Sequence, residues 1–174
     1  TNRLRVEAAR AFIQQARTSG GVGRVGMVQF SDNVKQLLPL TPLADEAAFE
    51  RALAAINENG QTDIDGSIRR GLNDLRSGRT HGTGAMVLLT DGKQEPNEYQ
   101  QAHQQARAAG VPVHTVALGK SADRNLLRRI AEETGGTFSE ATQDRDLLRL
   151  YSAIAGCIAG GRTVLNTALR KPEW

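Results

Sequence analysis

The sequence predicts an α/β fold: an open, mostly parallel β-sheet with helices on both faces and one antiparallel edge strand. From residue 41 onward, segments with helical spacing of apolar residues alternate with strand-like segments, the pattern of a parallel sheet. The apolar runs at 85–90 and 111–119 are nearly unbroken, as expected of strands that helices cover on both sides. The length of 174 residues suits one domain, predicted over 1–159 and followed by a C-terminal tail over 160–174.

The first part of the chain predicts one helix followed by a hairpin. Apolar residues recur every four positions over 3–18, which predicts an amphipathic helix packed by one face. The strand-like runs 22–30 and 34–40 are separated only by a short turn. A turn this short favours an antiparallel pair, and Pro39 marks the second run as an edge strand.

Caps and periodicity predict the remaining elements. Thr41–Pro42 has the N-cap and first-turn proline of a helix start. Pro96 starts a later helix that Gly110 ends, and Gly135–Gly136 ends another. The other elements expected are a helix with Ile64, Ile68, Leu72 and Leu75 on its buried side, a helix that includes 126–131, a short strand at 137–141 and a last helix that includes 147–154.

Composition argues against several classes of function. The net charge is only +3, and the basic pairs Arg69–Arg70 and Arg128–Arg129 fall within helical patterns, where they are typical of solvated faces. With four Phe, two Tyr and one Trp the chain lacks the aromatic interleaving of single-strand binders, so we expect no nucleic-acid partner. No run approaches the roughly 18 apolar residues of a membrane span. Cys157 is the single cysteine, so it cannot form an internal disulfide.

Two positions at the predicted sheet edge stand out on physical grounds. Asp91 follows the buried strand 85–90, at the carboxyl end where ligands bind in open α/β sheets. Thr62 lies in a loop just before a helix, with Asp63 and Asp65 close by. Taken singly, Thr62 is also explained as an N-cap hydroxyl with Asp65 near a capping-box position, and Asp91 as the turn residue of Asp–Gly. Both interpretations stay open on these residues alone.

An ordered set of segments favours the interpretation of Thr62 and Asp91 as parts of a binding site. In chain order they are FSDNVKQLLPLT, NGQTDIDGSIRRGL, MVLLTDGKQEPN, GVPVHTVALG and LLRRIAEETGGTF. With them the chain resembles the von Willebrand factor type A (vWA) domain family in its bacterial form, from residue 1 to about residue 155. The resemblance implies a Rossmann-like sheet and a non-catalytic module, for adhesion or as a scaffold, that binds another protein.

The resemblance also implies a metal-ion-dependent adhesion site. The family combines an Asp-x-Ser-x-Ser motif after its first strand with a Thr and an Asp from two further loops, and Thr62 and Asp91 match the last two. Hydroxyl and carboxylate oxygens suit Mg²⁺, or else Mn²⁺ or Ca²⁺, and an acidic side chain of the partner then completes the coordination. The residues expected around the ion, as a partner-binding rim, are Gly60, Gln61, Asp63, Gly92, Lys93 and Gln94.

The Asp-x-Ser-x-Ser motif and the strand before it do not occur in this sequence. In the family this strand is central, between those expected at 24–30 and 85–90, whose buried backbone groups therefore need another partner. Three hypotheses follow: a separately retained piece of the chain fills the gap, another protein adds a strand, or the C-terminal segment 162–170 folds into it. In the third, Asn166 and Ala168 stand where Asp and Ser are wanted. We expect metal binding to be weak or absent unless the missing segment is supplied.

Two other classes of function stay open: a structural vWA-like domain with a degenerate metal site, and a small-molecule or nucleotide enzyme on a doubly wound sheet. The segment 21–26 matches Gly-x-Gly-x-x-Gly, but a helix precedes it and a strand follows, the reverse of a dinucleotide-binding turn. His81, His103 and His114 are scattered and are expected to be structural. The resemblance favours an extracytoplasmic or cell-surface location.

Overall fold

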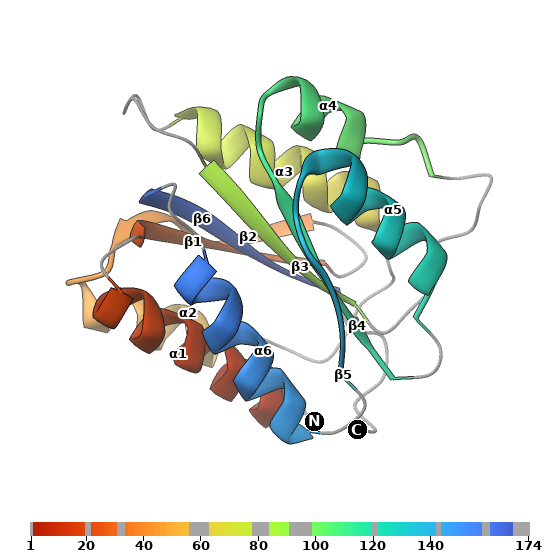
Figure 1. Cartoon of the computed structure of the whole chain (residues 1–174). Coiled ribbons are helices and arrows are strands. Elements are labelled where there is room, and N and C mark those ends of the chain that lie inside the picture. The colour runs from red at the N-terminus through yellow and green to blue at the C-terminus, as the bar shows by residue number, and fades with distance from the viewer. Residues whose placement is uncertain are drawn as a thin grey trace.

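The computed structural model contains one six-stranded sheet with the strand order β2-β1-β6-β3-β4-β5 (Figure 1). The structure describes residues 2–19, 22–30, 34–55, 63–77, 84–90, 99–119, 122–141, 144–157 and 161–168. The strands are β1 (Val22–Phe30), β2 (Val34–Pro42), β3 (Gly84–Thr90), β4 (Val113–Leu118), β5 (Phe138–Ala141) and β6 (Gly161–Ala168). The helices are α1 (Asn2–Ser19), α2 (Glu46–Ala54), α3 (Ile64–Ser77), α4 (His103–Ala108), α5 (Arg124–Thr134) and α6 (Asp144–Cys157).

The predicted fold class is confirmed. Every described strand pair is parallel except β1 with β2, which form the expected antiparallel hairpin with β2 at the edge. Helices α1, α2 and α6 cover one face of the sheet, and α3, α4 and α5 cover the other (Figure 1). All seven residues of β3 are buried, because its side chains alternate between the two helical layers.

The centre of the sheet holds β6, so the prediction of a missing central strand needs a correction. β6 pairs in parallel with β1 on one side and with β3 on the other. Leu165 lies opposite Met27 of β1 and Val87 of β3, and it is 1% exposed. The structure thus matches the third hypothesis, in which the chain's own C-terminal segment fills the gap. Neither a separate piece nor another protein's strand occupies this position.

The physical reason lies in the hydrogen-bonding demand of the two neighbours. β1 and β3 each present a row of backbone N–H and C=O groups toward the centre of the sheet, and buried groups of this kind are paired in native structures. β6 pairs with both rows over 161–168, residues that the sequence assigned to a tail.

The start of α2 also differs from its prediction. Thr41–Pro42 belongs to the end of β2, where Thr41 Oγ1 donates a hydrogen bond to the carbonyl of Pro39 at 2.8 Å. The helix begins four residues later, and Asp45 caps it by accepting from the backbone N–H of Ala48 at 3.2 Å. Pairing with β1 continues past Pro39 as far as Pro42. Asp45 then supplies the helix cap that the sequence assigned to Thr41.

Buried His114 gives the stability of this fold a pH dependence. The side chain lies on β4, where its Nδ1 accepts from the backbone N–H of Thr137 at 3.1 Å, and burial lowers its pKa from the ordinary value of 6.5. The unfolded chain then binds more protons than the folded one as the pH falls below about 6.5, so folding stability decreases with falling pH.

We expect His114→Gln, which keeps an acceptor but does not titrate, to reduce the loss of unfolding free energy between neutral and mildly acidic pH. Urea denaturation at a series of pH values measures this. The wild type is its own reference at neutral pH, and an unchanged slope in the variant contradicts the assignment.

Candidate functional site

The candidate site is the edge of the sheet where the parallel strands have their carboxyl ends. β3 ends there at Thr90, directly before Asp91, and α3 starts there at Ile64, two residues after Thr62. The predicted ligands Thr62 and Asp91 lie outside the described residues. So do the rim residues Gly60, Gln61, Gly92, Lys93 and Gln94. Their positions therefore remain predictions.

Asp63, the one described member of the predicted rim, caps α3. Its Oδ1 accepts from the backbone N–H of Gly66 at 2.8 Å, so the N-cap that the sequence offered to Thr62 is supplied one residue later. Asp65 does not complete a capping box either. Its two carboxylate oxygens accept from the backbone N–H groups of Gln100 and Ala102, at 2.7 and 2.9 Å. Both acids thus serve backbone donors, and sequence reasoning did not identify the partners of Asp65.

A side-chain network around the buried His103 joins α4 to α5 beside this segment. His103 is 0% exposed, and its Nδ1 bonds the hydroxyl of Tyr99 while its Nε2 bonds a carboxylate oxygen of Glu133. The same carboxylate accepts from Arg129 Nε at 3.3 Å. The Tyr99–His103 spacing of four residues is a sequence signal for one part of this network, but Glu133 lies 30 residues away.

The protonation states in this network follow from its geometry. The hydrogen bond from His103 holds the pKa of the Glu133 carboxyl below its usual range, and the charge of Arg129 adds to this effect. Burial raises the pKa of the Tyr99 phenol, and the charge of Asp65 raises it further. Tyr99 therefore stays protonated and Glu133 ionised. Because both ring nitrogens of the fully buried His103 are occupied, the network stabilises the packing of two helices rather than presenting a reactive group.

The described residues do not by themselves form a metal site. Within this part of the chain no three His, Cys, Asp or Glu side chains are grouped so that they could hold an ion. Asp63 and Asp65 bind backbone N–H groups instead. β6 brings Asn166 and Ala168 to the centre of the sheet, level with Leu88 and Thr90, and neither residue type supplies a carboxylate. The predicted ligands Thr62 and Asp91 lie outside the described residues, so a metal at this edge stays a prediction.

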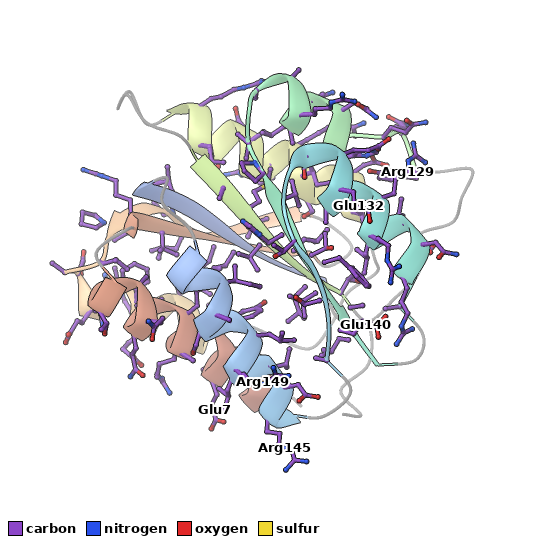
Figure 2. All side chains as sticks on the ribbon, in the orientation of Figure 1. Glu7, Arg129, Glu132, Glu140, Arg145 and Arg149 are labelled. Atoms are coloured by element: carbon purple, nitrogen blue, oxygen red, sulfur yellow. The ribbon has the colours of Figure 1, made fainter. Side chains whose placement is uncertain are left out.

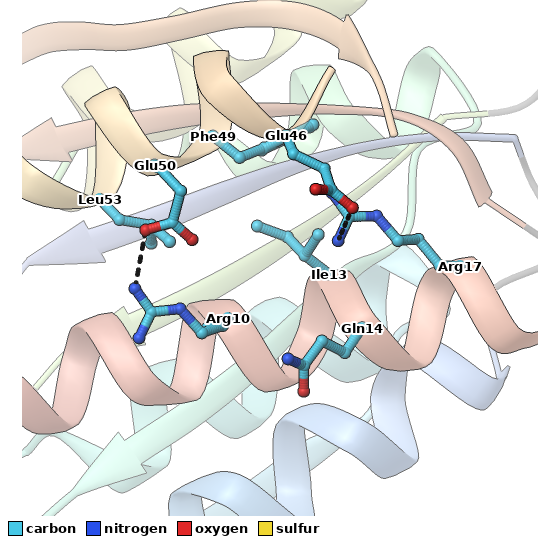
Figure 3. Close-up of a pocket in the computed structure, with 8 residues that line it drawn as sticks. All are labelled: Arg10, Ile13, Gln14, Arg17, Glu46, Phe49, Glu50 and Leu53. Atoms are coloured by element: carbon cyan, nitrogen blue, oxygen red, sulfur yellow. Dashed lines mark hydrogen bonds and ion pairs between the residues drawn. The ribbon is translucent and has the colours of Figure 1, made fainter. Parts of the chain in front are cut away.

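A surface pocket of about 240 Å³ lies away from the strand ends, between α1 and α2 (Figure 3). Ion pairs from Arg10 to Glu50 at 2.9 Å and from Arg17 to Glu46 at 3.7 Å span it. The residues that line it are Arg10, Ile13, Gln14, Arg17, Glu46, Phe49, Glu50 and Leu53. Its charged groups are paired with one another, so this pocket gives the enzyme hypothesis no support.

The fold and the order of the motifs agree with a known family. The model of the von Willebrand factor type A domain matches residues 3–153. The chain belongs to this family. No described helix of this vWA domain combines the length and apolar character that crossing a membrane requires.

Curated relatives of this vWA domain are much longer proteins. It is 31% identical over 153 residues to calcium-activated chloride channel regulator 1 of Bos taurus, covering 86% of this chain and 16% of the relative. It is 30% identical over 139 residues to matrilin-1 of Homo sapiens, covering 73% of this chain and 28% of the relative. The chain thus spans less than a third of the length of either.

Solved structures support the fold at lower sequence identity. A von Willebrand factor type A protein from Catenulispora acidiphila superposes with a TM-score of 0.78 at 17% identity, over 91% of this chain and 38% of that one. Proximal thread matrix protein 1 from the mussel byssus, solved with a zinc-occupied MIDAS motif, superposes with a TM-score of 0.71 at 21% identity, over 88% of this chain and 42% of that one.

Proposed function

We propose that this vWA domain is a non-catalytic adhesion or scaffold module that binds another protein through the loops at the carboxyl edge of its sheet. The observation that carries the proposal is family membership over residues 3–153 in a fold that brings the end of β3 and the start of α3 to this edge. Relatives that include a matrilin and a byssal thread matrix protein support a scaffold role and an extracytoplasmic location. In open α/β sheets this edge is where ligands bind.

In this proposal Thr62 and Asp91 hold a divalent cation, with Mg²⁺ the first candidate. A hydroxyl and a carboxylate are ligands of the right chemistry for a hard cation, which keeps water in its remaining positions. When bound, the ion supplies a positive charge, and an acidic side chain of the partner completes its coordination. The surrounding contact surface is the predicted rim: Gly60, Gln61, Asp63, Gly92, Lys93 and Gln94.

We expect the isolated chain to bind Mg²⁺ and Mn²⁺ more weakly than micromolar, because the Asp-x-Ser-x-Ser motif that supplies further ligands in the family does not occur in this sequence. Calorimetric titration measures the affinity. Asp91→Ala is expected to abolish any Mn²⁺ binding, whereas Glu132→Gln, on the exposed surface of α5, leaves it unchanged (Figure 2). Micromolar affinity that survives Asp91→Ala contradicts the assignment of the ligand.

One observation favours a second candidate, a structural vWA domain with a degenerate metal site. Asp63 and Asp65 are engaged by backbone donors, and β6 carries Asn166 and Ala168 in the central position. The two candidates differ in one measurable way. Binding of a protein partner that survives both Thr62→Ala and Asp91→Ala supports the second.

A further inference from the structure

The pocket between α1 and α2 combines an apolar floor with charged groups of both signs (Figure 3). Its floor consists of Ile13 from α1 and of Phe49 and Leu53 from α2, all of them buried. One arginine–glutamate ion pair lies at each end of the pocket, with Ile13 between the two pairs (Figure 3). At about 240 Å³ the pocket is smaller than the roughly 300–1,000 Å³ of sites for drug-sized ligands, so it suits a small molecule.

The two ion pairs differ in how closely their groups meet. Arg10 Nη2 donates directly to Glu50 Oε2 at 2.9 Å. Arg17 Nη1 and Glu46 Oε1 are 3.7 Å apart, which is too far for a direct hydrogen bond. The end of the pocket at Arg17 therefore holds two opposite charges whose hydrogen-bonding groups do not satisfy each other.

Arg17 is held in place by contacts other than the one with Glu46. Its Nε donates to the carbonyl of Leu43 at 2.9 Å, and its Cζ lies 6.0 Å from the centroid of the Phe49 ring. Among the described residues Leu43 is its one hydrogen-bond acceptor, although a guanidinium carries several further N–H donors. The remaining donors of this positioned guanidinium are thus available to a ligand.

We propose that the pocket binds a small zwitterion with an apolar body, namely a free amino acid with an apolar side chain. Arg17 receives its carboxylate, Glu46 receives its ammonium group, and the apolar side chain lies against the floor. A multiply charged anion is disfavoured, because two glutamates line the same pocket. Opening the pair of Arg17 and Glu46 costs little, because their side chains are 32% and 78% exposed.

Titration of the full chain with free leucine, followed by amide NMR, tests the site. We expect saturable shifts at Ile13, Phe49 and Leu53, with a dissociation constant in the millimolar range for a ligand of this size. The proposal is overturned if no saturable shift occurs, which leaves water as the occupant, or if the shifts are confined to residues outside the pocket.

Three analogues each lack one part of leucine. Isocaproate lacks the ammonium group, isopentylamine lacks the carboxylate, and glycine lacks the apolar side chain. Each is expected to bind about fivefold or more weakly than leucine, because one of the three contacts is lost. Isocaproate that binds as well as leucine overturns the assignment of Glu46.

Arg17→Gln removes the partner of the carboxylate and is expected to weaken leucine binding about fivefold or more. Arg51→Gln is the matched control, because it removes the same charge from the exposed surface of α2 outside the pocket. It is expected to change the affinity by less than about twofold. Equal weakening in the two variants shows a general effect of charge and overturns the contact with Arg17.

Should Arg17→Gln fail to fold, because it loses the hydrogen bond to Leu43, Glu46→Gln decides. Glu46 is exposed, so this change is expected to leave folding intact. It is expected to weaken the binding of leucine but not that of isocaproate, and an unchanged affinity for leucine overturns the proposal. The pocket lies away from the strand ends, so this inference goes beyond the proposed function and is tested independently of it.

Discussion

Leu165→Pro is expected to abolish cooperative folding, because β6 pairs with β1 on one side and with β3 on the other and so joins the two halves of the sheet. Leu165 lies between Met27 of β1 and Val87 of β3, at the centre of both ladders. Proline removes a backbone donor and does not fit a central strand, where it breaks pairing on a buried sheet. Such a loss leaves rows of unpaired backbone groups in a domain whose total stability is only about 5–15 kcal/mol.

Leu165→Ala measures the contribution of the buried side chain alone, because it keeps the backbone N–H and so the strand pairing. We expect it to lower the unfolding free energy by about 2–5 kcal/mol, the usual cost of emptying a fully buried leucine site. Leu148→Ala on α6 is the control, because Leu148 is 37% exposed and its loss is expected to change stability by less than about 0.5 kcal/mol. Guanidinium denaturation followed by far-UV circular dichroism measures all three. A Leu165→Pro protein with a wild-type transition rules out β6 as the central strand.

Gly136→Ala is expected to be the second severe change, lowering the unfolding free energy by about 3 kcal/mol or more. Gly136 lies beyond the C-terminal end of α5, where its N–H donates to Ala131 at 2.8 Å. A Cβ at this position meets the carbonyl oxygen of Val113 at 2.2 Å and its carbon at 2.5 Å. These are backbone atoms at the start of β4, so no rotamer change relieves the clash, and α5 must move away from the strand.

The adjacent Gly135 is a stringent control. It has a φ of +79° but open space around its Cβ position, so Gly135→Ala meets only the cost of the left-handed conformation, roughly 1 kcal/mol. Urea denaturation of the two variants compares a steric effect with a conformational one at neighbouring positions. Equal losses in the two variants would show that α5 does not approach β4 as closely as the structure has it.

The two predictions concern the parts of the fold that hold the candidate site in place. β6 connects β1 to β3, and β3 ends at Thr90, immediately before the proposed ligand Asp91. The contact at Gly136 sets α5 against β4, and α5 carries the Arg129 side chain that holds Gln101. Loss of the β6 pairing or of the close approach at Gly136 is therefore expected to disturb the candidate site as well as the stability of the fold.

The sequence by itself determined the order of the elements from α1 to α6, the fold class and the family. These depend on local patterns that each span fewer than twenty residues. Examples are the buried stripe of α3, the unbroken apolar run of β3 and the short turn of the hairpin. The glycines that end α4 and α5 were predicted for the same reason, and both Gly110 and Gly135 have positive φ.

Only the tertiary structure decided which segment fills the centre of the sheet and what Asp63 and Asp65 contact. The segment GRTVLNTA is half polar, so its own pattern is a weak strand signal; it pairs because β1 and β3 leave two rows of backbone groups to satisfy. Asp65 lies 35 and 37 residues along the chain from its backbone donors Gln100 and Ala102, and Gln101 between these donors has a φ of 56°. Hydrogen bonds across such separations depend on how helices pack in space, which no periodicity along the chain encodes.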